Sequence, residues 1–147
     1  MKSINTIAFN LLAVIVAVFF ISNNSLSENF FSEAKQEFDE KNYEDSKFLF
    51  QRNIVYNPKD SESYLYLAKI FKVEEDKNEE EKNIKTSLLL DPKNEQAMYF
   101  LIDLELERSN FSRAKELKED FILICVNMCD KMESIDNRIK AFEKTES

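Results

Sequence analysis

The sequence predicts an all-α fold made of repeated pairs of antiparallel helices. Its 147 residues include no Gly and only two Pro, which are too few turn residues for a sheet-rich fold. Apolar residues recur every three or four positions, the spacing of one helix face. Pro58 and Pro92 lie 34 residues apart in the same setting, "NPKD" and "DPKN". We therefore expect a helix-pair unit of that length, ended by each proline and followed by a capping residue, Asp60 or Asn94.

Residues 1–27 differ in character from the rest of the chain. A positively charged start precedes an apolar run, Ile7–Ile21, and small residues at Ser25 and Ser27 precede Glu28. This is the three-part pattern of a secretory signal peptide. As a helix the run would span about 22 Å, short of the roughly 30 Å hydrocarbon core of a membrane. A slightly longer helix would approach that thickness, so an uncleaved N-terminal membrane anchor is the alternative.

Three helix pairs are expected after the N-terminal segment, separated by short polar breaks. The expected helices cover residues 28–40, 43–56, 61–73, 79–90, 95–107 and 111–125. Within the second and third pairs, apolar stripes should form the core, and the side chains expected to be buried are Leu67, Ala68, Phe71, Ile84, Leu88 and Leu101. Glu81 and Lys85 are placed to form an exposed ion pair one helical turn apart. Neither helix of a pair can bury its apolar face alone, which is why the unit repeats.

The C-terminal residues form a further segment, 130–147. It carries one more apolar stripe, made of Met132, Ile135, Ile139 and Phe142. We expect a seventh helix here that covers the open end of the stack, followed by a short tail. The predicted organisation is therefore 1–27 as signal peptide or anchor, 28–129 as helical repeats and 130–147 as capping helix and tail.

The repeated unit resembles the tetratricopeptide repeat (TPR) family. That family has a large apolar residue at position 4 of 34, Leu and a small residue at 7 and 8, an aromatic at 11, a small residue at 20 and Pro at 32. The chain departs from the pattern at Glu80, Ile102 and Glu105. The middle unit matches it at Tyr64, Leu67, Ala68, Phe71, Ile84, Ser87 and Pro92. The resemblance covers about residues 28–125 and implies an α-solenoid of about three TPR-like helix pairs plus a C-terminal capping helix.

The resemblance also implies a concave groove lined by the first helix of each pair. The positions that face it in the family give a candidate partner-binding surface of Phe31, Lys35, Leu65, Lys69, Lys72, Tyr99, Asp103 and Leu106. This set is apolar with a small basic centre, which favours an extended peptide of somewhat acidic character. The alternative is that these side chains pack on neighbouring helices. The carboxylate clamp that grips chaperone C-termini is not expected, because Phe31, Lys35 and Tyr66 do not fit its pattern.

Cys125 and Cys129 are spaced C-x3-C. Three readings are open: a structural disulfide, two buried free thiols, or a redox-active pair. Export favours the disulfide. Residues four apart on one helix are too distant for that bond, so it requires a helix break between them. Asn127 tolerates left-handed backbone angles, and Asp130 could cap a new helix, so we expect the sixth helix to end near Cys125 and the seventh to begin near Asp130.

Enzyme chemistry finds little support in the sequence. Without His and Gly, the usual triads, mixed Cys/His zinc sites and phosphate-binding loops are missing. The acidic run Glu74–Glu81 is read as a solvated break rather than a metal or acid–base site, and we expect no cofactor, metal or small-molecule substrate. The net charge of −8 disfavours nucleic acid and anionic lipid as partners. The membrane would be contacted only through an uncleaved N-terminal segment.

The prediction for function is an exported, non-enzymatic TPR protein that binds a protein or peptide partner in its groove and has a possible role in assembling an envelope complex. The expected location is the periplasm of a Gram-negative bacterium, or the inner membrane facing it. Two alternatives stay open: a structural subunit that uses its outer helices, and, with weaker support, a thiol-redox helper acting through Cys125 and Cys129.

Overall fold

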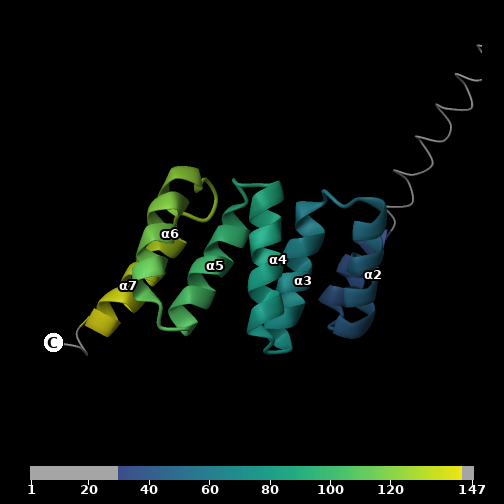
Figure 1. Cartoon of the computed structure of the whole chain (residues 1–147), viewed down its shortest axis with the longest axis horizontal. Coiled ribbons are helices and arrows are strands. Elements are labelled where there is room, and N and C mark those ends of the chain that lie inside the picture. Colours follow the sequence, from purple (N-terminus) through teal and green to yellow (C-terminus); the bar gives the residue numbers. More distant parts are fainter. Residues whose placement is uncertain (1–29, 144–147) are drawn as a thin grey trace, which may run out of the picture. The chain divides into compact units, whose positions relative to one another are not determined.

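A computed structural model describes residues 30–143 of the chain, and the expected signal peptide or anchor lies outside these residues. Helices alone make up the regular structure of this described part, as predicted (Figure 1). The chain divides into two compact units, one ending at Pro58 and the other beginning at Lys59. None of the helices in residues 30–143 is long and apolar enough to cross a membrane.

The described part of the first unit is one helix pair. Residues 30–39 are helical, and α2 spans Tyr43–Tyr56. Ala34 and Phe50 are fully buried between the two helices, and the Ser46 hydroxyl donates a 2.8 Å hydrogen bond to the Ala34 carbonyl oxygen. The small side chains of Ala34 and Ser46 let the two backbones approach closely.

The second unit stacks two helix pairs and a last helix. The helices are α3 (Ser61–Val73), α4 (Lys77–Leu90), α5 (Glu95–Glu107), α6 (Phe111–Ile124) and α7 (Lys131–Glu143). Each helix packs on the next from α3 to α7, and α7 also packs on α5. Figure 1 shows α3 to α6 side by side along the stack. The fold class expected from the sequence is therefore confirmed, including the seventh helix.

One apolar core runs from α3 to α7, with most of its members on α5, α6 and α7. Its members with the least exposure are Ile84, Ile102, Leu104, Ala114, Phe121 and Ile135. Leu67, Ala68, Ile84 and Leu101 are buried as expected, whereas Phe71 and Leu88 are half-buried. Since each helix contributes to a shared core, no single pair accounts for the fold.

The turns repeat as regularly as the helices. Lys41, Glu75 and Ser109 have φ angles of 66°, 60° and 59°, and each residue lies 34 positions after the one before it. Each occupies the left-handed region that Gly adopts most readily, in a chain that has no Gly. The period seen in the sequence is thus present in the backbone itself.

The two loops after the prolines differ in how they cap the next helix. The Asn94 side chain accepts a 2.9 Å hydrogen bond from the Ala97 backbone N–H, as predicted for a cap. Asp60 occupies the corresponding position before α3, but its side chain makes no capping hydrogen bond to the backbone, which corrects the prediction for Asp60. Its carboxylate instead accepts a 2.6 Å hydrogen bond from the Ser63 hydroxyl.

Candidate protein-binding surface

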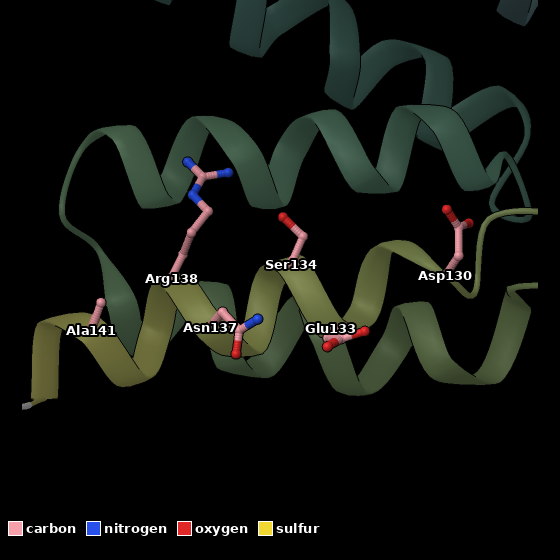
Figure 2. A pocket seen from close by; sticks show the side chains of 6 residues that line it. All are labelled: Asp130, Glu133, Ser134, Asn137, Arg138 and Ala141. Carbon is pink, nitrogen blue, oxygen red and sulfur yellow. The ribbon is translucent and has the colours of Figure 1, made fainter.

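Three helices of the second unit, α3, α5 and α7, are joined through one carboxylate. Asp103 lies on α5, and its two oxygens accept hydrogen bonds from α3 and α7. Lys72 Nζ is 2.5 Å from Asp103 Oδ2, and Arg138 Nη1 is 2.5 Å from Asp103 Oδ1. Figure 2 shows the Arg138 side chain directed from α7 toward the neighbouring helix. α3 and α5 are the first helices of the two pairs and α7 is the capping helix, so the contact links three helices along the stack.

A second carboxylate extends this contact. Glu107 accepts a 2.9 Å hydrogen bond from Lys72 and lies 3.2 Å from Lys77 Nζ. We call Lys72, Lys77, Asp103, Glu107 and Arg138 the ion network. With three cations and two carboxylates, most of its charge is balanced internally. One positive charge is left over, so the preference for a somewhat acidic peptide stays a prediction.

The contacts within the ion network determine the protonation states of Asp103 and Lys72. Burial alone would raise the pKa of Asp103, but the hydrogen bonds and positive charges of Lys72 and Arg138 outweigh it and lower the pKa. Burial alone would likewise lower the pKa of Lys72, and its hydrogen bonds to Asp103 and Glu107 raise it instead. Both groups are therefore charged at neutral pH.

Aromatic rings lie beside the ion network. Lys69 Nζ donates a 2.9 Å hydrogen bond to the Gln96 side-chain oxygen, which joins α3 to α5. The same ammonium lies 4.1 Å from the ring centroid of Tyr66 and 5.9 Å from that of Phe100. Contacts of this kind are attractive because the ring face is electron-rich. Polar and aromatic groups therefore lie side by side on this surface, and aromatic residues are enriched at protein interfaces.

The structure brings together four of the residues predicted to line the groove and separates the others. Lys69, Lys72, Tyr99 and Asp103 lie on α3 and α5 and are partly exposed. Leu65 is 0% exposed and Leu106 is 6% exposed, which corrects the expectation that these two side chains are open to a partner. Both are apolar, and Leu106 packs into the common core.

Phe31 and Lys35 belong to the first unit. Phe31 is half-buried, with its ring centroid 5.7 Å from that of Phe50, and Lys35 is exposed. Both line a shallow surface pocket along residues 31–40. Their role in binding stays a prediction.

Arg138 was not predicted, because the last helix was expected only to cover the core. It also lines a shallow pocket along α7, shown in Figure 2, with Asp130, Glu133, Ser134, Asn137 and Ala141. The available signal was its position between Ile135 and Ile139, which places a cation at the edge of the buried stripe.

Glu80, on α4, is an acidic residue at a buried position. It is 2% exposed, and its Oε1 atom has no hydrogen-bond partner. Burial raises the pKa of Glu80, while the nearby Lys72 ammonium lowers it and Glu107 and Asp103 raise it further. This is the position at which the repeat pattern has a small residue.

Glu80→Gln should therefore stabilise the protein at pH 7, by about 1 kcal/mol on the scale for unpaired buried polar groups. With its pKa raised, Glu80 binds more protons in the folded state than in the unfolded state, so its unfavourable contribution grows as pH rises through the folded-state pKa. Denaturant unfolding of both proteins should show a gain that shrinks as pH falls toward 4.5, the ordinary value. The matched control is Glu79→Gln on the same helix, whose partner is the exposed Lys82. An equal gain in the control would contradict this reading.

The two cysteines form a disulfide in the turn between α6 and α7. Their Sγ atoms are 2.14 Å apart and their Cα atoms 5.3 Å apart. α6 ends at Ile124 and α7 begins at Lys131, so the predicted helix break is confirmed. The reason given for the break was wrong, because Asn127 is not among the residues with positive φ. Cys125 itself leaves the helix, with extended angles of −66° and 135°.

Contacts from α5 fix this turn. The Glu95 carboxylate accepts hydrogen bonds from the backbone N–H groups of Asn127 and Met128, at 2.9 and 2.8 Å. A further bond of 3.3 Å comes from the Asn127 side chain. The pKa of Glu95 is lowered most by the backbone of Val126, and the backbone groups of Met128 and Asn127 lower it as well. A tertiary contact, rather than a local turn preference, therefore holds the loop in place.

The polar groups of the surface are engaged with one another. No group of three or more Cys, Asp or Glu side chains within residues 30–143 could hold a metal ion.

The fold and this surface together define a helical-repeat protein, a stack of paired helices with a polar and aromatic face on its first helices. Similar structures are TPR domains. The OM64 TPR domain of Arabidopsis has a TM-score of 0.73 at 14% identity, covering 82% of this chain and 98% of that one. The Sgt2 TPR domain of Aspergillus fumigatus has a TM-score of 0.68 at 17% identity, covering 80% and 82%.

A third similar structure contains a bound peptide. The Yersinia enterocolitica type III secretion chaperone SycD, in complex with a peptide of the translocator YopD, has a TM-score of 0.70 at 16% identity, covering 82% of this chain and 94% of that one. No family model matches the sequence, and no curated protein matches it. At these identities the likeness establishes the fold, which is that of a TPR array.

Proposed function

We propose that this chain is a non-enzymatic protein-interaction module that binds a segment of a partner protein on the surface formed by α3, α5 and α7. The observation that carries the proposal is the side-chain array of these helices. Lys69–Gln96 and Lys72–Asp103 join α3 to α5 by hydrogen bonds, and Asp103–Arg138 joins α5 to α7. A segment crossing the helices would meet these groups in turn. The similar structure of SycD is a complex with a peptide of YopD, which supports a peptide as ligand.

Export is part of the proposal. The N-terminal pattern and the disulfide both favour a compartment in which disulfides persist, such as the periplasm or the periplasmic face of the inner membrane. The partner would then be another envelope protein, and the role that we propose is assembly of an envelope complex.

The test begins with capture of a partner from an envelope extract, its identification by mass spectrometry and its purification. Binding affinity is then measured for the wild type and for Lys69→Ala with Tyr99→Ala, two partly exposed residues of the surface. We expect the pair of substitutions to raise the dissociation constant at least about tenfold, equivalent to about 1.4 kcal/mol. Thermal unfolding verifies that the variant remains folded.

The control variant is Lys82→Ala with Leu89→Ala, two exposed residues of α4. Its affinity should stay within about twofold of the wild type. The reverse pattern, with loss only in the α4 variant, would replace this proposal with the alternative that the chain is a structural subunit binding through its outer helices. Exposed apolar side chains at Leu89 and Leu123, 80% and 83% exposed, are the observation that favours this alternative.

A further inference from the structure

The Cys125–Cys129 disulfide lies at the protein surface, next to exposed apolar side chains. Both cysteines are partly exposed. Ile122, Leu123 and Val126, here called the apolar rim, are 43%, 83% and 80% exposed. Leu123 lies two residues before Cys125 and Val126 directly follows it, and Cys125 Sγ lies 3.9 Å from the Ile122 carbonyl oxygen. Exposed apolar side chains that lie together on a protein surface often mark an interaction site.

The disulfide is not the sole support of its turn. Three hydrogen bonds to Glu95 hold Asn127 and Met128, which lie between the two cysteines, against α5. Met128 and Cys129 also accept backbone hydrogen bonds from Lys131 and Met132, at 3.0 and 3.2 Å, at the start of α7. The bond itself joins residues only four apart, and so short a closed loop removes little entropy from the unfolded chain. The turn can therefore keep its shape when the bond opens, and the bond contributes little to stability.

We propose that this turn is a thiol–disulfide exchange site and that the apolar rim docks a dithiol oxidoreductase. A dithiol oxidoreductase is the partner that the site fits, because such an enzyme acts on disulfides. The rim lies next to Cys125, so an enzyme that reaches the disulfide must contact the rim. Exchange requires the partner's thiolate to approach a sulfur in line with the S–S bond, so atoms flanking that sulfur must contact the partner. This site is separate from the surface on α3, α5 and α7.

The reaction balances as two exchange steps. A thiolate of the partner attacks Sγ of one cysteine, a mixed disulfide forms, and the other cysteine leaves as a thiolate that takes up a proton. The partner's second thiol then loses its proton and attacks the partner's own sulfur in the mixed disulfide, which releases the first cysteine. The partner's dithiol is oxidised to a disulfide by two electrons, and Cys125 and Cys129 are reduced. The reverse sequence restores the bond.

The test uses the purified oxidised chain and reduced thioredoxin as the dithiol oxidoreductase. The rate at which two alkylatable thiols appear is compared for the wild type and for Leu123→Ser with Val126→Ser. We expect thioredoxin to reduce the wild type at least about a hundredfold faster than dithiothreitol at equal concentration, and the rim variant at least about tenfold more slowly than the wild type. Dithiothreitol should reduce both proteins at equal rates, because a small thiol needs no docking surface.

The matched control is Val73→Ser with Leu89→Ser, which removes two exposed apolar side chains elsewhere, 53% and 80% exposed. Its rate with thioredoxin should equal that of the wild type. A thioredoxin whose second active-site cysteine is replaced by serine should also give a one-to-one mixed disulfide with the wild type. Equal rates for the rim and control variants, or no advantage of thioredoxin over dithiothreitol, would overturn the proposal and leave the bond purely structural.

Discussion

Phe121→Ala should lower the free energy of unfolding by about 3–5 kcal/mol, the range for removal of a buried aromatic side chain. Phe121 is 0% exposed and lies in the core formed by α5, α6 and α7. Its loss would leave a cavity where the last helix pair meets the capping helix, so the stack would lose packing on several sides at once. Denaturant unfolding of the whole chain, followed by far-UV circular dichroism, measures this change in the free energy of unfolding.

Leu123→Ala is the matched control for this prediction. Leu123 lies on the same helix, two residues further along, and is 83% exposed. Its truncation should change the free energy of unfolding by no more than about 0.5 kcal/mol. Similar losses for the two variants would mean that the assignment of the inner and outer faces of α6 is wrong.

The architecture of this chain could be predicted because several independent sequence features recur with the same period. The paired prolines, the apolar stripes and the polar breaks all agree on 34 residues, and local and tertiary preferences therefore point to one fold. The left-handed residues Lys41, Glu75 and Ser109 follow the same period. Their identities differ, so no residue type reveals them in the sequence.

The candidate surface was predicted less completely, for two physical reasons. Position within a repeat gives the direction of a side chain but not its exposure, so Leu65 and Leu106 were placed on the surface although both are buried. Contacts between distant segments leave no periodic signal. The partners of Asp103 lie 31 residues before it and 35 residues after it, at Lys72 and Arg138.

In the turn that holds Cys125 and Cys129, too, the local feature was predicted and the tertiary contact was not. The helix break followed from covalent geometry, because residues four apart on one helix do not meet disulfide distances. The residue that holds the turn, Glu95, lies more than 30 residues away in sequence and was read only as the first residue of a helix. Prediction therefore succeeded where the constraint was local and failed where a tertiary hydrogen bond supplied it.

Asp103→Asn tests whether the ion network links α3, α5 and α7. The carboxylate is 17% exposed and bonds to cations on both neighbouring helices. Replacing it with a neutral amide removes two charge-assisted contacts and leaves Lys72 and Arg138 close together. We expect the free energy of unfolding at pH 7 to fall by about 1–3 kcal/mol, the cost of breaking a partly buried charged hydrogen bond. Asp130→Asn is the control, because that side chain is 70% exposed and pairs only loosely with Lys131, at 3.4 Å.

The pH dependence of this effect has a defined sign. The folded-state pKa of Asp103 lies below its ordinary value of 3.8, so the unfolded state binds more protons in that range. The stability that Asp103 contributes is therefore complete above its ordinary pKa and is lost as pH falls through the folded-state pKa. Unfolding curves of wild type and Asp103→Asn should differ most at neutral pH and converge in acid. The effect of Glu80→Gln also vanishes in acid but has the opposite sign, because that substitution stabilises the protein. A difference that persists unchanged below the folded-state pKa would show that the amide disturbs packing, and that the charge of Asp103 does not link the three helices.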